Sequence, residues 1–362
     1  MLEKKKYYDL SKLLECRCNW NILYGMRSNG KSYAVKEHTL KQAFNKGVKF
    51  VYLRRWSEDI KTKDVDTYFD DIDIKKITGG KYNGVMAYQG FFYFSYIDEE
   101  AEKESRGPQI GRYCSLNQGE RYKSQVFNDD YGIIIFEEFL TNKIYLGSAE
   151  NPEPWQLMHF VSTVARDRDI KVFMIGNTIS RVCPYFSEWG LSGVMLQKPG
   201  TIDIYHLRGE NGVVDIAVEN CEVVETKSKM FFGNSSKQIT SGEWEVNDCA
   251  KLLKPYAYYD MLYEIDIQYG DFKYIMQLMC DGETGGTFVY IYPNTSGRKI
   301  NRVITNVFHV DPYITNGLNP RIRAEQMIAK CFREGSVCYS DNLTGTDFKQ
   351  ILANYDLKGV KF

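Results

Sequence analysis

An eight-residue pattern near the N-terminus constrains the fold of this chain more than any other feature of its sequence. Residues 25–32 read Gly-Met-Arg-Ser-Asn-Gly-Lys-Ser, a full match to G-x-x-x-x-G-K-S. The pattern follows a short apolar run at Asn21–Tyr24, and apolar residues recur at helical spacing over Lys31–Asn45. A strand, a glycine-rich loop and a helix in this order are typical of a phosphate-binding loop, so we expect this segment to hold a nucleotide.

Each residue type in this loop has a physical role. Glycines let the backbone wrap around phosphates, while successive N–H groups and the helix N-terminus supply positive potential. Lys31 is expected to reach the β and γ phosphates of ATP, and Ser32 to ligate Mg2+. The alternative is a chance glycine turn before a helix. The candidate nucleotide-binding residues are Gly25, Met26, Arg27, Ser28, Asn29, Gly30, Lys31 and Ser32.

The remainder of the N-terminal half alternates between apolar runs and helical spacing. Lys49–Leu53, Gly132–Phe136 and Lys171–Gly176 read as buried strands, and Pro154–Ala165 reads as a helix. This alternation is typical of an α/β domain with a mostly parallel sheet. Ala87–Ile97 reads as a hairpin.

Two further expectations concern the surface of this domain. The charged, glycine-containing segment Asp98–Asp130 is expected to be a mobile excursion. The spacing in the Pro154–Ala165 helix predicts a buried face made of Trp155, Met158, Phe160 and Val164.

The length of 362 residues favours two or three domains over a single core. Residues 1–207 form the predicted α/β domain, residues 208–247 a linker or small subdomain, and residues 248–362 a C-terminal domain. In the C-terminal domain we expect helices at Asp248–Leu262 and Arg321–Phe332 and strands at Lys273–Met279 and Thr287–Tyr292.

Charge is distributed unevenly along the chain. The 46 basic and 47 acidic residues nearly cancel, but residues 1–63 hold 15 basic and 6 acidic side chains. A uniformly basic, polyanion-binding protein is therefore excluded, whereas a local basic surface near the N-terminus is allowed. No apolar run reaches the roughly 18 residues of a membrane span, so we expect an intracellular protein that has no membrane partner. The nine scattered cysteines form no CxxC pair and are expected to be reduced.

Two carboxylates follow the apolar strand Gly132–Phe136. We expect Glu137 to hold Mg2+ and Glu138 to activate the attacking water, because an acidic pair at the end of a buried strand is costly unless it is used. Glu137 is one methylene longer than the aspartate usual at this position. The alternative is a solvated acidic turn.

The next apolar strand ends in Asn177, whose amide is expected to sense the γ-phosphate and hold the attacking water, unless it forms only a turn. Arg166 and Arg168 precede that strand. One of them, Arg166 ahead of Arg168, is expected to reach a neighbouring subunit's γ-phosphate as an arginine finger; the alternative is that both complement a helix dipole.

A basic segment follows the second predicted strand. Its candidate contacts to the DNA backbone are Arg54, Arg55, Lys61 and Lys63, next to the aromatic Trp56. The alternative is a solvated basic loop, and Arg54 is also placed to couple such a loop to the nucleotide site.

In combination, these motifs resemble the additional-strand catalytic-glutamate ATPases. In length and layout the chain is similar to the DNA-packaging ATPases of phi-twenty-nine-like phages. The resemblance implies a homo-pentameric ring at the portal vertex of a procapsid in the host cytoplasm, with double-stranded DNA in its pore. It also implies an arginine finger that acts between subunits, and an α+β C-terminal domain of RNase H-like fold, a vestigial nuclease that docks on a partner. Participation of a structural RNA in docking is left open.

The sequence therefore predicts a magnesium-dependent ATPase that moves viral DNA into a capsid. Three alternatives remain: an FtsK-like or HerA-like DNA pump or helicase, a terminase-like enzyme with an active nuclease domain, and a nucleotide-gated assembly protein without hydrolysis. A two-metal nuclease needs carboxylates that converge on ions roughly 3.5 to 4 Å apart. The acids to examine for such a site are Asp266, Asp271, Asp281 and Asp341.

Overall fold

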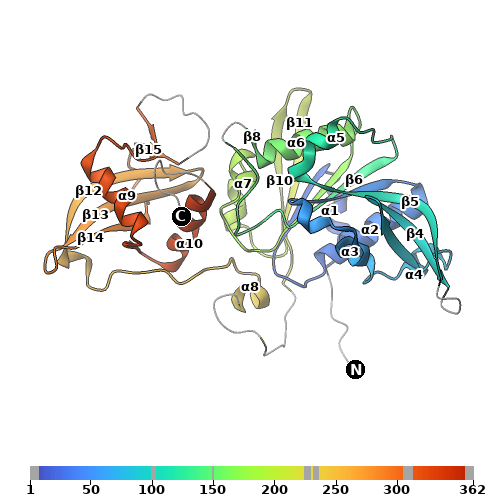
Figure 1. Cartoon of the computed structure of the whole chain (residues 1–362), viewed down its shortest axis with the longest axis horizontal. Helices are drawn as coiled ribbons and strands as arrows, with labels where there is room; N and C mark the ends of the chain where they lie inside the picture. Colours follow the sequence, from blue (N-terminus) through green and yellow to red (C-terminus); the bar gives the residue numbers. More distant parts are fainter. Residues whose placement is uncertain are drawn as a thin grey trace.

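The fold comes from a computed structural model of the whole chain. It describes residues 8–98, 103–148, 151–223, 230, 236–304 and 313–354. Two mixed sheets, each with helices packed against it, occupy the N-terminal and C-terminal parts of the chain (Figure 1). Within these ranges no helix is long and apolar enough to cross a membrane.

The larger sheet has nine strands, and its six central strands are parallel. Antiparallel strands extend it at both edges. In spatial order the strands are β10 (Thr201–Gly209), β11 (Gly212–Asn220), β1 (Trp20–Tyr24), β9 (Lys171–Ile175), β6 (Tyr131–Glu137), β2 (Lys49–Arg54), β5 (Lys103–Ser115), β4 (Phe91–Asp98) and β3 (Gly84–Tyr88). The predicted α/β class with a mostly parallel sheet is confirmed.

The order of the central strands positions the candidate site. β9 lies between β1 and β6, so the strand that precedes Asn177 separates the P-loop strand from the strand that ends in Glu137. Parallel neighbours place all their carboxyl ends at one edge of the sheet. The loops after β1, β6 and β9 therefore meet there.

Both faces of this sheet are covered, which explains why its central strands are continuously apolar. Alternate residues point to opposite faces: Ile134 and Phe136 pack with one cluster, Ile133 and Ile135 with the other. One face is covered by α5 (Gly119–Lys123), α6 (Glu153–Ala165) and α7 (Pro184–Glu188). The other is covered by α1 (Ser11–Glu15), α2 (Lys31–Lys46), α3 (Thr62–Val65) and α4 (Ile74–Thr78).

The expectation of a mobile excursion at Asp98–Asp130 is wrong. β5 occupies thirteen residues of this segment and pairs with both β2 and β4. Gly111, which suggested a loop, lies opposite Phe50, and a Cβ at Gly111 would approach the Phe50 ring to 2.7 Å. The glycine here makes room for a core aromatic ring.

The α6 helix is confirmed, but half of its predicted buried face is wrong. Phe160 and Val164 are buried, whereas Trp155 is 53% and Met158 is 48% exposed. Leu157 and Glu153 lie inside instead. A buried glutamate at the start of the helix rotates the inward face away from the apolar side chains that the spacing favoured.

The N-terminal sheet extends past the predicted boundary at residue 207. Residues 208–220, which the sequence placed in a linker or small subdomain, belong to the β10–β11 hairpin, and Ile216–Asn220 of β11 pair with the whole of β1. Gly209 and Gly212 flank the tight turn of that hairpin, with a φ of +136° at Gly212. Glycine spacing alone does not distinguish such a turn from a linker.

The second sheet has six strands, and α9 (Arg323–Arg333) and α10 (Asn342–Asn354) pack against one of its faces. Its strands are, in order, β16 (Thr315–Asn316), β15 (Arg302–Val303), β12 (Tyr259–Tyr269), β13 (Phe272–Asp281), β14 (Thr287–Pro293) and β17 (Val337–Tyr339). The predicted helix at Asp248–Leu262 is wrong, because β12 begins at Tyr259; the predictions for β13, β14 and α9 are confirmed. The comparison with an RNase H-like fold stays a prediction.

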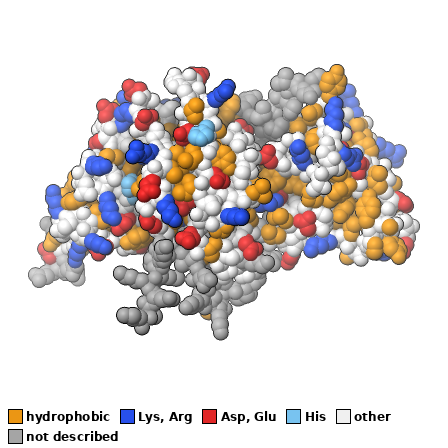
Figure 2. All heavy atoms as spheres, turned by 180° about the vertical axis from the view of Figure 1, so that it is seen from behind, with side chains coloured by type: hydrophobic (Ala, Val, Ile, Leu, Met, Phe, Trp, Pro, Cys, Tyr) orange, Lys and Arg blue, Asp and Glu red, His pale blue; other side chains and the backbone are white. Residues whose placement is uncertain are grey.

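On the opposite face of this sheet Glu264, Gln277 and Tyr290 lie side by side in register. The Tyr256 hydroxyl donates to Gln277 Oε1 at 3.0 Å, and the Tyr256 ring lies 6.1 Å from that of Tyr290. Figure 2 shows hydrophobic side chains gathered over this C-terminal part of the chain, interspersed with basic ones.

The chain between the two sheets is anchored on the N-terminal domain. It includes α8 (Ser236–Ser241), after which the Trp244 ring stacks on Tyr24 with centroids 5.5 Å apart. The Glu245 N–H donates to the Thr178 carbonyl at 3.0 Å. Residues 242–245 therefore contact the end of β1 and the residue that follows Asn177.

Gly111→Ala tests the placement of β5. We expect a loss of about 1–3 kcal/mol in the free energy of unfolding, because the new methyl group overpacks the Phe50 ring. The matched control is Gly119→Ala in the same segment, where a Cβ meets nothing within 4 Å and φ is −49°. That change should be neutral or stabilise by about 0.4–1 kcal/mol. Equal, near-zero effects in urea denaturation would contradict the placement.

Candidate active site

The P-loop has the backbone geometry that its glycines allow. It runs from the end of β1 to the start of α2, with φ values of +145° at Gly25, +100° at Gly30 and +58° at Ser28. A Cβ at Gly25 would lie 3.3 Å from the Cys221 carbonyl oxygen, so this glycine also permits close packing on the segment after β11.

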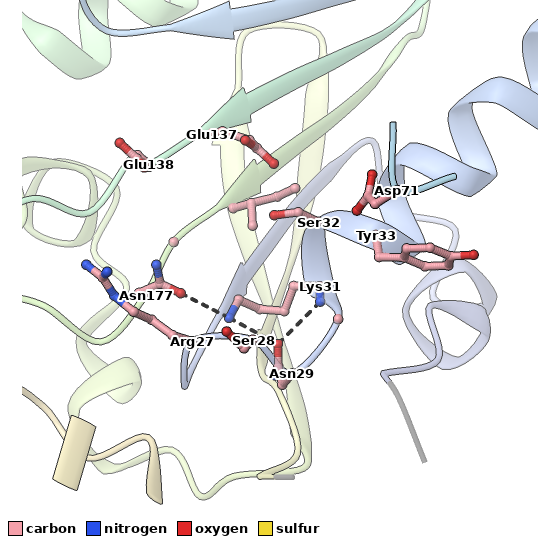
Figure 3. A pocket seen from close by; sticks show the side chains of 13 residues that line it. Arg27, Ser28, Asn29, Lys31, Ser32, Tyr33, Asp71, Glu137, Glu138 and Asn177 are labelled. Atoms are coloured by element: carbon pink, nitrogen blue, oxygen red, sulfur yellow. Dashed lines mark hydrogen bonds between the residues drawn. The ribbon is translucent and has the colours of Figure 1, made fainter. Parts of the chain in front are cut away.

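Lys31 is folded onto the loop from which it projects. Its side chain is buried, and Nζ donates to the Met26 carbonyl at 2.6 Å, to Asn29 Oδ1 at 3.2 Å and to Asn177 Oδ1 at 3.3 Å (Figure 3). Burial lowers the pKa of this lysine from 10.5 to about 8. Phosphate oxygens at this position would supply the negative charge that the buried ammonium lacks.

The P-loop and the strand ends enclose one pocket of about 740 Å3, within the size range of small-molecule and cofactor sites. Its lining includes the predicted residues Arg27, Ser28, Asn29, Gly30, Lys31, Ser32, Glu137, Glu138 and Asn177. Gly25 and Met26 lie at the start of the loop, outside the lining. The pocket is also lined by Tyr33 and Asp71, which no sequence motif marks. Asp71 lies in an acidic stretch with no motif of its own, so only the fold brings it here.

Glu137 fits the role of a magnesium-holding carboxylate. Its Oε1 atom is buried and, among the described residues, has no hydrogen-bond partner. Burial raises the pKa of the Glu137 carboxyl, whereas the nearby Ser32 hydroxyl and Arg54 guanidinium oppose that rise. In Figure 3 the carboxylate points toward Ser32. An unpartnered buried carboxylate oxygen next to a hydroxyl matches the oxygen ligands that Mg2+ prefers.

Glu138 differs from Glu137 in both backbone and surroundings. Its φ is +57°, a left-handed conformation that is rare for a residue other than glycine. Its side chain is largely exposed and forms an ion pair with Arg54, whose Nη2 lies 2.6 Å from Glu138 Oε2. The carboxylate points away from Lys31 in Figure 3. Arg54 therefore contacts the candidate catalytic acid itself.

The prediction that Arg55 contacts DNA is wrong. Its guanidinium is buried and forms an ion pair with Glu153, whose side chain is also fully buried. Lys61 and Lys63 are exposed after β2, at the same edge of the sheet as the pocket. They remain candidates for DNA contact.

The two candidate finger arginines have different surroundings. Arg168 donates to the carbonyl oxygens of Asp129, Tyr131 and Val164, so it braces the local backbone. Arg166 ends α6 with a φ of +55°, is exposed and makes no ion pair within the described part of the chain. It precedes β9, whose five residues span roughly 16 Å toward the pocket. Arg166 is thus remote from the pocket of its own chain, whose lining does not include it.

The four acids considered for a nuclease do not converge. Asp271 and Asp281 lie at opposite ends of β13, roughly 33 Å apart at the usual rise of a strand. Asp266 pairs with Arg298 at 3.5 Å, and Asp341 accepts hydrogen bonds from the start of α10. The described residues contain no group of three or more acidic, His or Cys side chains able to hold a metal ion.

The chain is similar to known proteins both in sequence and in fold. A profile of the family described as "Podovirus DNA encapsidation protein (Gp16)" matches residues 2–239. The chain belongs to this family. The DNA packaging protein of Bacillus phage phi29 is 26% identical over 196 residues, which cover 52% of each chain. That of Bacillus phage B103 is 28% identical over 172 residues, 47% of this chain and 48% of the relative. The alignments thus span about half the length of these curated relatives.

A solved structure of the bacteriophage Phi-29 viral genome packaging motor assembly is similar over 95% of this chain and 99% of that chain. The TM-score is 0.54 at 18% sequence identity. This likeness concerns the fold. The Gp16 family match and the fold confirm the resemblance to phi29-like packaging proteins.

The contrast between the neighbouring arginines predicts different costs of removal. Arg54→Ala should lower the free energy of unfolding by no more than about 1 kcal/mol, because its ion pair with Glu138 is partly exposed. Arg55→Ala should cost about 3–5 kcal/mol, because it leaves the Glu153 carboxylate buried without a counter-charge. Urea denaturation measures both, and a similar small cost for the two variants would contradict the buried pair.

Proposed function

We propose that this protein is a magnesium-dependent ATPase that drives double-stranded viral DNA into a procapsid. The observation that carries the ATPase proposal is convergence: Lys31, Glu137, Glu138 and Asn177 come from three parallel strands and line one pocket with the P-loop. No chance glycine turn would gather an acidic pair and a strand-end amide at the same place.

The division of roles follows from the surroundings of each group. Lys31 and the loop N–H groups bind the phosphates, and Ser32 with Glu137 would hold Mg2+, which screens the phosphate charge when bound. Glu138 accepts a proton from the attacking water, and Asn177 orients that water beside the γ-phosphate. Glu138 must leave Arg54 before its carboxylate can face the water, so Arg54 links this step to the basic loop after β2.

The DNA-packaging role rests on family membership and on the names of the relatives. The phi29 and B103 relatives are DNA packaging proteins, and the similar structure is a packaging motor assembly. For this chain we infer a ring, a pentamer by that resemblance, that docks on the portal vertex in the host cytoplasm. The C-terminal domain would serve in docking, and a structural RNA is among its candidate partners.

The ATPase proposal is tested by separating nucleotide binding from hydrolysis. Lys31→Ala should weaken ATP binding, because it removes the charge held against the phosphates. Glu138→Gln should keep binding and lose hydrolysis, because an amide cannot accept the water's proton. Fluorescent-nucleotide titration and DNA-stimulated phosphate release give the two quantities. Near-parental hydrolysis by Glu138→Gln would move the catalytic role to another acid.

The DNA contact is tested by salt dependence. If Lys61 and Lys63 meet phosphates, affinity for duplex DNA should fall steeply with salt and not depend on sequence. Replacing both with alanine should reduce the slope of log affinity against log salt by roughly one per lost contact. Lys330→Ala with Lys349→Ala, exposed in α9 and α10, serves as the charge-matched control. An unchanged slope assigns Lys61 and Lys63 to solvent.

Subunit mixing tests the arginine finger. Arg166→Ala should depress hydrolysis by roughly 10³- to 10⁵-fold with nucleotide binding nearly intact. Mixing it with Glu138→Gln should restore some activity, since interfaces that pair an intact Glu138 with an intact Arg166 rebuild a site. Arg168→Ala is the control and should not be rescued in this way. If mixed rings co-assemble but stay inactive, a structure with a bound ATP analogue decides the question. The finger is ruled out if Arg166 lies far from every γ-phosphate in that structure.

A further inference from the structure

Arg55 and Glu153 form a buried ion pair that the proposed mechanism does not use. Arg55 Nε lies 2.8 Å from Glu153 Oε2, and Arg55 Nη2 lies 2.9 Å from Glu153 Oε1. The carboxylate also accepts from the Tyr185 hydroxyl at 2.9 Å and from the Leu146 N–H at 2.6 Å. Removing two charges from water is expensive, and a pair of hydrophobic residues often serves stability as well. Stability alone therefore does not explain why the chain buries this ion pair.

The remaining guanidinium donors of Arg55 point at the backbone beside the candidate catalytic acid. Nη1 donates to the Glu138 carbonyl at 3.0 Å, and Nη2 donates to the Phe139 carbonyl at 2.7 Å. Only a planar guanidinium can hold a carboxylate and two consecutive carbonyls at once, because its donors form a rigid fork. Glu153 fixes the fork, and the fork fixes the chain at residues 138 and 139.

The held backbone is strained. Glu138 has a φ of +57°, and a left-handed residue other than glycine costs about 1–2 kcal/mol. Such a conformation persists only where the surroundings determine it. Here the Phe139 N–H donates to the Ile175 carbonyl at 3.3 Å, and Arg55 holds the carbonyls on both sides of that N–H. A relaxed φ at residue 138 would redirect the Cα–Cβ bond and change which positions the carboxylate can reach once it leaves Arg54.

We propose that Arg55, fixed by Glu153, is a positioning residue that holds the Glu138 backbone in the left-handed conformation and so fixes the point from which the carboxylate turns from Arg54 to the water. This rests on the proposed role of Glu138 in hydrolysis. Arg55 acts differently from Arg54, since Arg54 contacts the carboxylate and Arg55 contacts only the main chain. Arg55 keeps its hold on the Glu138 main chain throughout ATP hydrolysis.

Arg55→Lys is the first test, because it keeps the charge beside Glu153 and removes the fork. We expect kcat to fall by about 10- to 100-fold, the cost of a small misplacement of a catalytic group. The dissociation constant for ATP should change by less than about two-fold, since no contact to the nucleotide is lost. Lys330→Ala, an exposed side chain in α9, is a control outside this network. Unchanged kcat, or an equal loss in nucleotide binding, overturns the proposal.

A double-mutant cycle separates positioning from general damage. ADP with aluminium fluoride mimics the transition state, so its affinity reports on the alignment of the attacking water without requiring turnover. Arg55→Lys should weaken this complex and leave ADP binding intact, and it should have no further effect when Glu138 is already glutamine. A loss of the same size in the Glu138→Gln background shows that Arg55 acts elsewhere and overturns the proposal.

A second variant covers the case in which Arg55→Lys does not fold. The pair Arg55→Met with Glu153→Leu replaces the buried ions by apolar side chains of similar size, which proteins often tolerate. It should fold, bind ADP and show the same selective loss. Failure of both variants to fold overturns the proposal, because the pair would then be needed for the fold itself. Full activity of Glu138→Gln would instead refute the proposed function, whatever Arg55 does.

Discussion

The parallel pairing of β1, β9, β6 and β2 is the constraint on which the candidate site depends. Because parallel strands share the direction of their carboxyl ends, the P-loop, the acidic pair and Asn177 meet at one edge, although 146 residues separate Lys31 from Asn177. The place of β9 between β1 and β6 brings the Asn177 amide within hydrogen-bond distance of Lys31. This order brings together the groups to which we assign action on one phosphate.

The end of β2 acts on the same site through two consecutive residues with opposite properties. Arg54 is half-buried and pairs with a largely exposed carboxylate, so water competes for that contact and it can be exchanged. Arg55 is buried, and its contacts to Glu153 and to the Glu138 and Phe139 carbonyls are shielded from water, so these contacts persist. Glu138 is thus held by its main chain and left mobile at its carboxylate. This suits the proton transfer that we propose for Glu138.

Local patterns predicted much of this architecture. The P-loop, the central strands, the β3–β4 hairpin and the acidic pair were identified because each is encoded in one short segment, where spacing and turn residues determine the conformation. β5 and β12 were missed. In β5 charged residues and glycines hide a strand whose Gly111 makes room for Phe50, a residue that lies far away in sequence. In β12, Ile265, Ile267 and Tyr269 alternate with polar residues, as in a strand. The helix-like spacing of the preceding segment nevertheless favoured a helix that runs into β12.

The sequence by itself determined that this chain brings a P-loop and a strand-end acidic pair into a candidate nucleotide pocket. Those features depend on the order of residues within single elements, which a linear pattern records. Only the tertiary structure decided that Arg55 is buried against Glu153, that Asp71 lines the pocket, and that Arg166 is exposed at the far end of β9. Arg54 and Arg55 are the same residue type at adjacent positions, so a sequence pattern treats them alike. Their roles diverge because burial and partner depend on side chains nearly a hundred positions away, which no local pattern specifies.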